Sequence, residues 1–307
     1  MSELRQDVVT GAQVIVAPGR STRPDTFRTT APALPPSVPA CPFCDGNEVD
    51  TPPEVCRTGP GAPDTPGWRV RVVPNKYPIV RAGVGGAHEV AVLSPAHDVT
   101  LADLDDGAVT ELFCVLRDRV GHHLAQGRAH AHAFVNHGKP AGASIEHPHA
   151  QIVALDFLPP FVDSVLDRFA AARRDLVHDA IDEARAGDLV IADGEATTWC
   201  PPASTGPYAV RGALRYGRQR FDSAADGEVR ATGVAVRDMV VRLRTVLGDV
   251  PYNVVLNTAP AGDDRPFHWW VDILPRLTVT AGFEQATGLH VCTVEPADAV
   301  QALREAT

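Results

Sequence analysis

The sequence has no excess of positive charge. It contains 28 Lys and Arg residues against 38 Asp and Glu residues, which gives a formal net charge of −10 at pH 7. Affinity for a nucleic-acid backbone needs a basic surface, so this balance argues against a general nucleic-acid binder. A small phosphate ligand stays compatible with it, because such a ligand needs only a few local hydrogen-bond donors.

Long apolar runs are also missing, and cysteine is scarce. No run approaches the roughly 20 apolar residues that span a bilayer, and segment 1–10 lacks the apolar core of a signal peptide. We therefore expect no membrane partner and a cytoplasmic location. The few cysteines are scattered, unlike a secreted disulfide framework, which favours free thiols or metal ligands. They are Cys41, Cys44, Cys56, Cys114, Cys200 and Cys292.

Two stretches of the chain, 68–156 and 188–275, show the same order of features. Each has two strand-like runs, a long segment with apolar residues at helical spacing, a strand ending in Asn, a loop and a closing strand. This order predicts an α+β fold of two tandem halves, each a mainly antiparallel sheet with a packed helix. Landmarks that repeat at an offset of 120 or 121 residues are Asp106–Gly107 and Asp226–Gly227, Asn136 and Asn257, and His147 and His268.

The two copies differ at the closing strand. An offset of 121 places His149 opposite Trp270 and Gln151 opposite Asp272. The first copy therefore carries chemistry that the second has lost. We expect residues 1–160 to hold the nucleophile and the metal site. Residues 161–307 would form a degenerate half that contributes to substrate binding.

The strand His147-Pro-His-Ala-Gln151 carries three polar side chains on one face. Residues two apart on a strand point the same way, so His147, His149 and Gln151 lie together. The alternative is an exposed edge strand with incidental histidines. The preceding loop, 138–144, supplies glycines where a backbone can approach a phosphate, and Ser144 adds a hydrogen-bonding group, as does Asn136. The segment therefore predicts an anion site beside an imidazole.

His149 is the predicted nucleophile of a nucleotidyl transfer. An imidazole attacks phosphorus when it is neutral and held in one tautomer. A fixed acceptor for the Nδ1 proton would leave Nε2 free to attack. Gln151 would donate to a phosphate oxygen as negative charge develops.

Cys41-Pro-Phe-Cys44 is one half of a typical zinc site. A thioredoxin-like redox pair is the rival interpretation, but a proline-rich loop precedes the motif where a strand–helix–strand unit would be expected. His97 and His147 are the predicted partners, with Cys56 as a substitute ligand. Such a Cys2His2 site would tie the N-terminal loop to the strand of His149 and so position it.

Several separate motifs resemble those of galactose-1-phosphate uridylyltransferases, a family of the histidine-triad superfamily with two tandem histidine-triad-like halves. The segments Asn136-x-Gly138, Gly142-Ala-Ser144 and His147-Pro-His-Ala-Gln151 are similar to its active-site segment. Three further segments agree in order along the chain: 14–24 with Arg20 and Arg23 at phosphate-contacting positions, 73–78 with Asn75 at a nucleoside-contacting position, and 282–284 with Glu284 at a sugar-contacting position.

The resemblance implies a ping-pong enzyme with nucleotide-sugar and sugar-phosphate substrates. His149 would attack the α-phosphorus of a nucleotide sugar, and the nucleotidyl-His149 would then pass UMP to a hexose 1-phosphate, as in galactose metabolism. The carbonyl of His147 would orient His149, while Gln151, Ser144 and the two arginines bind phosphate oxygens. The resemblance also implies a homodimer with shared sites. Residues at substrate-binding positions are Arg20, Arg23, Asn75, Asn136, Gly142 and Glu284, and those at zinc-ligand positions are Cys41, Cys44, His97 and His147.

The second half departs from the family pattern. His268-Trp-Trp270 stands where relatives commonly have His-x-His, and Cys200 has no C-x-x-C partner. We therefore expect no second metal site. Three alternatives to uridylyl transfer remain: a phosphorylase of ADP-glucose or of a dinucleotide, a hydrolase, and a non-catalytic nucleotide-binding protein.

Overall fold

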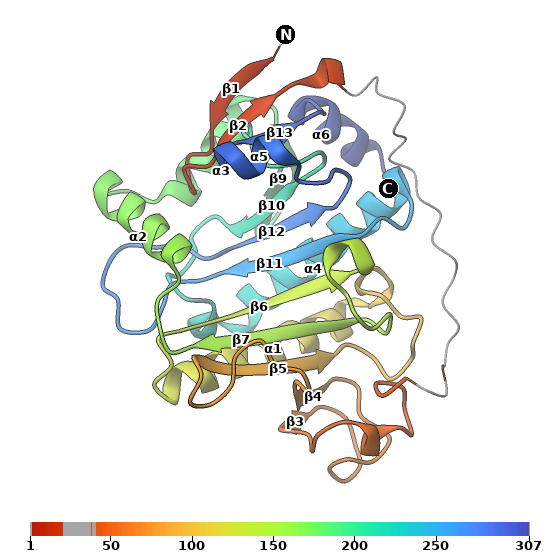
Figure 1. The fold of residues 1–307 in the computed structure, drawn as a ribbon. Helices are drawn as coiled ribbons and strands as arrows, with labels where there is room; N and C mark the ends of the chain where they lie inside the picture. The colour runs from red at the N-terminus through yellow and green to blue at the C-terminus, as the bar shows by residue number, and fades with distance from the viewer. Residues whose placement is uncertain (1, 21–37, 39–40, 307) are drawn as a thin grey trace.

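The computed structural model describes residues 2–20, 38 and 41–306. A ten-stranded antiparallel sheet runs through the molecule, and a three-stranded sheet lies beside one end of it (Figure 1). The large sheet has the order β3 (Cys56–Arg57), β4 (Arg71–Pro74), β5 (Gly86–Val92), β7 (His149–Leu155), β6 (His130–His137), β11 (Tyr252–Asn257), β12 (Trp270–Pro275), β10 (Val210–Leu214), β9 (Ala196–Trp199) and β8 (Val190–Asp193). The small sheet has the order β1 (Glu3–Gln6), β2 (Gln13–Val16) and β13 (His290–Cys292).

The strand order of the large sheet is symmetric about its centre. Strands β4, β5, β7 and β6 on one side correspond to β9, β10, β12 and β11 on the other. In the central pair, Phe134 of β6 lies opposite Val255 of β11, and these two positions differ by the repeat offset of 121. A pseudo-two-fold axis therefore passes between them. The predicted duplicated α+β fold is confirmed.

One match drawn from the sequence is wrong by a strand. The sequence pattern treats the runs 68–73 and 188–192 as the equivalent first strands of the two halves. In the sheet the first run contributes β4, whereas the second contributes β8, whose counterpart is the two-residue strand β3. The pattern could not show this, because β3 is too short to produce a visible alternation.

Two long helices cover one face of the large sheet and leave the other face for the site (Figure 1). They are α1 (Asp106–Ala125) and α4 (Asp226–Leu247). Helix α1 begins where the Asp105 side chain accepts a hydrogen bond from the Ala108 N–H. Gly233 lets the helices approach closely, because a Cβ there would lie 3.2 Å from the Phe113 ring. No helix in the described part of the chain is long and apolar enough to cross a membrane.

Shorter helices lie around these two layers. The α-helices are α2 (Pro160–Ala172), α3 (Leu176–Ala186), α5 (Gly282–Thr287) and α6 (Pro296–Glu305). The 3-10 helices are η1 (Pro18–Arg20), η2 (Glu48–Asp50), η3 (Leu101–Asp103), η4 (Lys139–Ala141) and η5 (Phe221–Ser223). The predicted phosphate contact Arg23 lies outside the described residues. Of Arg20, only its backbone, at the end of η1, is described.

Candidate active site

His149 is the first residue of β7 and lies on the open face of the sheet. The alternate residues Ala150 and Ile152 are fully buried on the helical side. The Nδ1–H of His149 donates to the backbone carbonyl of His147 at 2.8 Å, which leaves Nε2 without a proton. Burial lowers the pKa of His149, so its imidazole is neutral near pH 7. This is the tautomer and charge state that a nucleophilic imidazole requires.

A pocket of about 770 Å³ opens in front of His149. Six predicted residues line it: Asn75, Asn136, Gly142, Ser144, His149 and Gln151. Glu284 does not line the pocket, because it lies in α5, where its side chain caps the Ala281 N–H. The sequence analysis did not identify several further lining residues: Phe43, His88, Lys76, Tyr77 and the segment 49–52. Lys76 is the only Lys or Arg among the described lining residues.

His88 fixes the orientation of the Gln151 amide. The Ile79 N–H donates to Nδ1 of His88 at 3.3 Å, so the His88 proton resides on Nε2. That Nε2–H donates to Oε1 of Gln151 at 2.8 Å. The Gln151 NH2 group is therefore free to donate to a phosphate oxygen. Burial lowers the pKa of His88, which keeps this ring neutral and the arrangement stable near pH 7.

Replacing His88 should loosen this amide. We expect His88→Phe to lower kcat/KM about tenfold, because Gln151 loses the partner that selects its orientation. His132→Phe is the matched control, since His132 lies on the same face of the sheet outside this pocket. Steady-state kinetics of the two variants checks the prediction. Equal kcat/KM values would show that His88 does not orient Gln151.

The loop after β6 is held by the second half of the chain. Gly142 adopts a left-handed conformation with φ 96°, which closes the loop beside Asn136. The Asn253 amide of β11 donates to Oδ1 of Asn136 at 2.7 Å and to the carbonyl of Ala141 at 2.8 Å. The amide NH2 of Asn136 is therefore available to the pocket. The second half thus positions groups of a site whose predicted nucleophile, His149, belongs to the first half.

The four predicted metal ligands come together behind His149. One ligand atom from each of Cys41, Cys44, His97 and His147 lies within 4.8 Å of the others, and all four residues are buried. The Cys44 Sγ lies 3.4 Å from Nδ1 of His97 and 3.6 Å from Nδ1 of His147. A tetrahedral Zn²⁺ with ordinary Zn–S and Zn–N bonds separates such ligands by about 3.5 Å.

The hydrogen bonding of His147 suits the same site. Its Nε2–H donates to the carbonyl of Ser94 at 2.7 Å, which directs Nδ1 toward the two sulfurs. Burial lowers the pKa of His147 to about 4, so the ring is neutral and able to bind a metal. The donor set therefore fits a four-coordinate metal without Cys56, which lies in β3 and whose pKa burial raises to about 11. The metal cluster would act by holding His147, whose carbonyl orients His149.

Comparison with known proteins agrees with this geometry. Residues 122–306 match a family described as "Domain of unknown function (DUF4921)". The chain is 31% identical to the ADP-glucose phosphorylase of Arabidopsis thaliana, over 99% of this chain and 92% of that protein. It is also 31% identical to the galactose-1-phosphate uridylyltransferase of Streptomyces lividans, over 46% of this chain and 42% of that protein. The chain belongs to the galactose-1-phosphate uridylyltransferase family.

A solved structure of this family superimposes over the whole chain. The crystal structure of the Arabidopsis thaliana ADP-glucose phosphorylase with bound ADP-glucose gives a TM-score of 0.88 at 28% identity, covering 100% of this chain and 99% of that one. The predictions of a nucleotidyltransferase and of the family fold are confirmed. The alternative prediction of a phosphorylase is supported better than the main prediction of UMP transfer, because the relative that is 31% identical over 92% of its own length is a phosphorylase.

Proposed function

We propose that this protein is a nucleotide-sugar phosphorylase that acts on ADP-glucose. Nε2 of His149 attacks the α-phosphorus, and the bond from that phosphorus to the glucose 1-phosphate oxygen breaks. An oxygen of orthophosphate then attacks the adenylyl-His149, the N–P bond breaks, and ADP leaves. In the intermediate between the two steps, the proton stays on Nδ1 of His149 and remains hydrogen-bonded to the His147 carbonyl. Neither step therefore needs a separate base at this ring.

The other lining groups would bind the phosphates. Ser144, the NH2 of Gln151 and the NH2 of Asn136 offer neutral donors to the α-phosphate, and Lys76 offers a positive charge. Asn75 would contact the nucleoside. Gly142 would allow a phosphate close to the backbone. The site geometry together with full-length similarity to an ADP-glucose phosphorylase supports this assignment over uridylyl transfer.

We also propose zinc as the metal and a homodimer as the working form. Two thiolates and two imidazoles are a typical donor set for zinc. A dimer would give Glu284 a role, since this side chain does not line the pocket of its own chain and would reach the pocket of a partner. Residues 1–160 would then carry the chemistry, and residues 161–307 would supply the Asn253 support and the Glu284 contact.

The substrate assignment has a direct test. Glucose 1-phosphate release is measured from ADP-glucose with orthophosphate and from UDP-glucose with galactose 1-phosphate. We expect kcat/KM for ADP-glucose with orthophosphate to exceed that of the uridylyl reaction at least tenfold, a difference of about 1.4 kcal/mol in transition-state binding. The opposite ranking would favour a uridylyltransferase. Release of AMP without orthophosphate would indicate a hydrolase.

A further inference from the structure

One wall of the pocket, the segment 49–52, is not part of a β-sheet. The segment from Val49 to Pro52 lines the pocket, yet it consists only of the end of η2 and the following loop. Val49 is 87% exposed, so apolar packing does not fix the segment. Its position must therefore come from polar contacts on the side away from the pocket.

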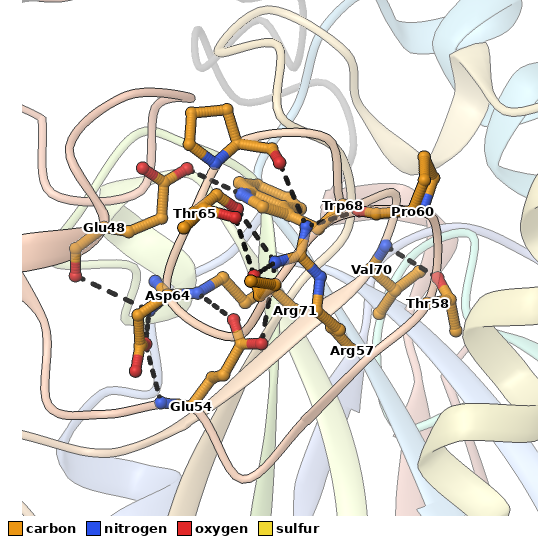
Figure 2. A network of polar contacts seen from close by, with 12 residues as sticks. Glu48, Glu54, Arg57, Thr58, Pro60, Asp64, Thr65, Trp68, Val70 and Arg71 are labelled. Atoms are coloured by element: carbon orange, nitrogen blue, oxygen red, sulfur yellow. Dashed lines mark hydrogen bonds and ion pairs between the residues drawn. The ribbon is translucent and has the colours of Figure 1, made fainter.

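Arg71 and Trp68 supply such contacts. The Trp68 indole N–H donates to the Glu48 carboxylate at 2.8 Å, while Arg71 holds the backbone of Glu48 and the side chain of Thr51; Figure 2 shows the Glu48 contacts. Arg71 lies on β4 and is only 1% exposed. Its Nη1 donates to Oγ1 of Thr51 at 2.8 Å, and its Nη2 donates to the carbonyl of Glu48 at 3.5 Å. One guanidinium thus holds the residues on both sides of Val49 and Asp50. Only a planar fork with several donors can reach these acceptors at once.

Two carboxylates hold the guanidinium in turn. Nε of Arg71 donates to Oε2 of Glu54 at 2.7 Å, and Nη2 donates to Oδ1 of Asp64 at 2.6 Å. The Glu54 side chain is 3% exposed, so this ion pair is shielded from water. Separating the buried Arg71 guanidinium from either carboxylate would leave an unpaired buried charge, which costs folding free energy. The guanidinium is therefore held rigidly in place. The same Oδ1 of Asp64 accepts the Glu54 N–H at 2.9 Å and closes the network.

The wall lies on the nucleoside side of the pocket. Apart from Lys76, which follows β4, the groups that would bind phosphate come from β7, from β6 and from the loop 138–144. The segment 49–52 is tied to β4, two strands away from β7. A nucleotide with its α-phosphorus at His149 therefore extends its base and ribose toward this wall. This placement rests on the proposed function.

We infer that Arg71 is a positioning residue for nucleotide binding, acting through Thr51 and Glu48 on the wall of the nucleoside subsite. Arg71 lies outside the set of residues that line the pocket, so its effect is indirect. The wall it holds contributes binding energy when a free nucleotide sugar enters. Once the nucleotide is covalently attached to His149, the wall no longer determines whether the nucleotide stays.

The two half-reactions therefore distinguish a positioning role of Arg71 from a general effect on folding. In a ping-pong cycle, kcat/KM for the nucleotide sugar reports the first half-reaction, and kcat/KM for orthophosphate reports attack on the covalent intermediate. We expect Arg71→Lys to lower kcat/KM for ADP-glucose about tenfold and to change kcat/KM for orthophosphate less than about twofold. A variant that only reduces the folded fraction would lower both values equally.

Arg57 provides the matched control. It lies in the same network, with its Nη1 3.7 Å from Oε1 of Glu54 (Figure 2). Its guanidinium donates to the carbonyls of Pro60, Ala62 and Thr65, none of which lines the pocket. Arg57→Lys should leave both kcat/KM values unchanged. Equal effects of Arg57→Lys and Arg71→Lys on kcat/KM for ADP-glucose would overturn the inference.

A second pair of variants covers the case in which Arg71→Lys does not fold. Thr51→Val keeps the shape of the side chain but removes the acceptor for Arg71 and the hydroxyl that donates to the Glu48 carbonyl, whereas Thr51→Ser keeps both contacts. Calorimetry with AMP should give a Kd about tenfold higher for Thr51→Val and an unchanged Kd for Thr51→Ser. Equal AMP affinity in the wild type and Thr51→Val would overturn the positioning role. A wild type that binds AMP but does not phosphorolyse ADP-glucose would instead contradict only the proposed function.

Discussion

His149→Ala should lower kcat for ADP-glucose phosphorolysis by roughly 10⁴-fold or more, because among the described lining residues His149 alone presents an imidazole nitrogen without a proton or a partner, the two ring nitrogens of His88 being hydrogen-bonded to Ile79 and Gln151. The pocket places the free Nε2 of His149 among the phosphate-binding groups, and the His147 carbonyl holds its tautomer. Steady-state release of glucose 1-phosphate measures the loss. The variant should also fail to exchange label between glucose 1-phosphate and ADP-glucose in the absence of orthophosphate, since this exchange needs only the first half-reaction.

His122→Ala is the control for this loss. His122 is exposed on α1, on the helical side of the sheet, and does not line the pocket. Its replacement should leave kcat and the exchange reaction unchanged. Turnover by His149→Ala within about tenfold of wild type would assign the nucleophile to another residue or make the transfer direct.

Loss of one metal ligand should be the second large effect. We expect Cys44→Ser to reduce bound zinc from about one per chain to a small fraction and to lower the free energy of unfolding by several kcal/mol. Structural zinc sites in small peptides bind with about 10–16 kcal/mol, and that energy stabilises the folded state. Activity should fall as well, because His147 supplies both a ligand and the carbonyl that orients His149.

Cys114→Ser separates the metal site from general thiol chemistry. Cys114 is a partly buried thiol on α1, outside the cluster, and should keep full zinc content and stability when replaced. Metal analysis and denaturant unfolding of the two variants check both statements. A Cys44→Ser protein with full zinc and wild-type stability would contradict the ligand set.

The repeat and the main motifs could be predicted because they are local. The motif from His147 to Gln151 shows its alternating polar residues in five consecutive positions, and the offset of 121 aligns helices and strands without any tertiary information. The predicted start of the strand is wrong by two residues: β7 begins at His149, and His147 lies before it in the Cys/His cluster. The metal ligands could be predicted because Cys41 and Cys44 demand partners, and the histidines of such a set are few.

The supporting contacts could not be predicted, because they depend on strand register. His88 reaches Gln151 only because β5 and β7 pair with Val90 opposite Gln151, which brings the side chain two residues away into contact. Nothing in the sequence around His88 reveals this register. The role of Asn253 likewise depends on the pairing of β6 with β11 across the pseudo-two-fold axis.

The pocket wall was missed for a different reason. The segment 49–52 has no periodic pattern, and its place is fixed by Arg71 from a strand about twenty residues later. An arginine in a buried strand gives no sign of the loop that it holds. Contacts of this kind emerge only from the folded chain.

The central claim is that His149 carries the nucleotide between donor and acceptor. Intact-protein mass spectrometry of the wild type, incubated with ADP-glucose in the absence of orthophosphate, tests it most directly. We predict a mass increase of one adenylyl group on His149, which disappears when orthophosphate is added as ADP is formed. Full phosphorolysis with no adduct at any time, or an adduct on another residue, would contradict the account.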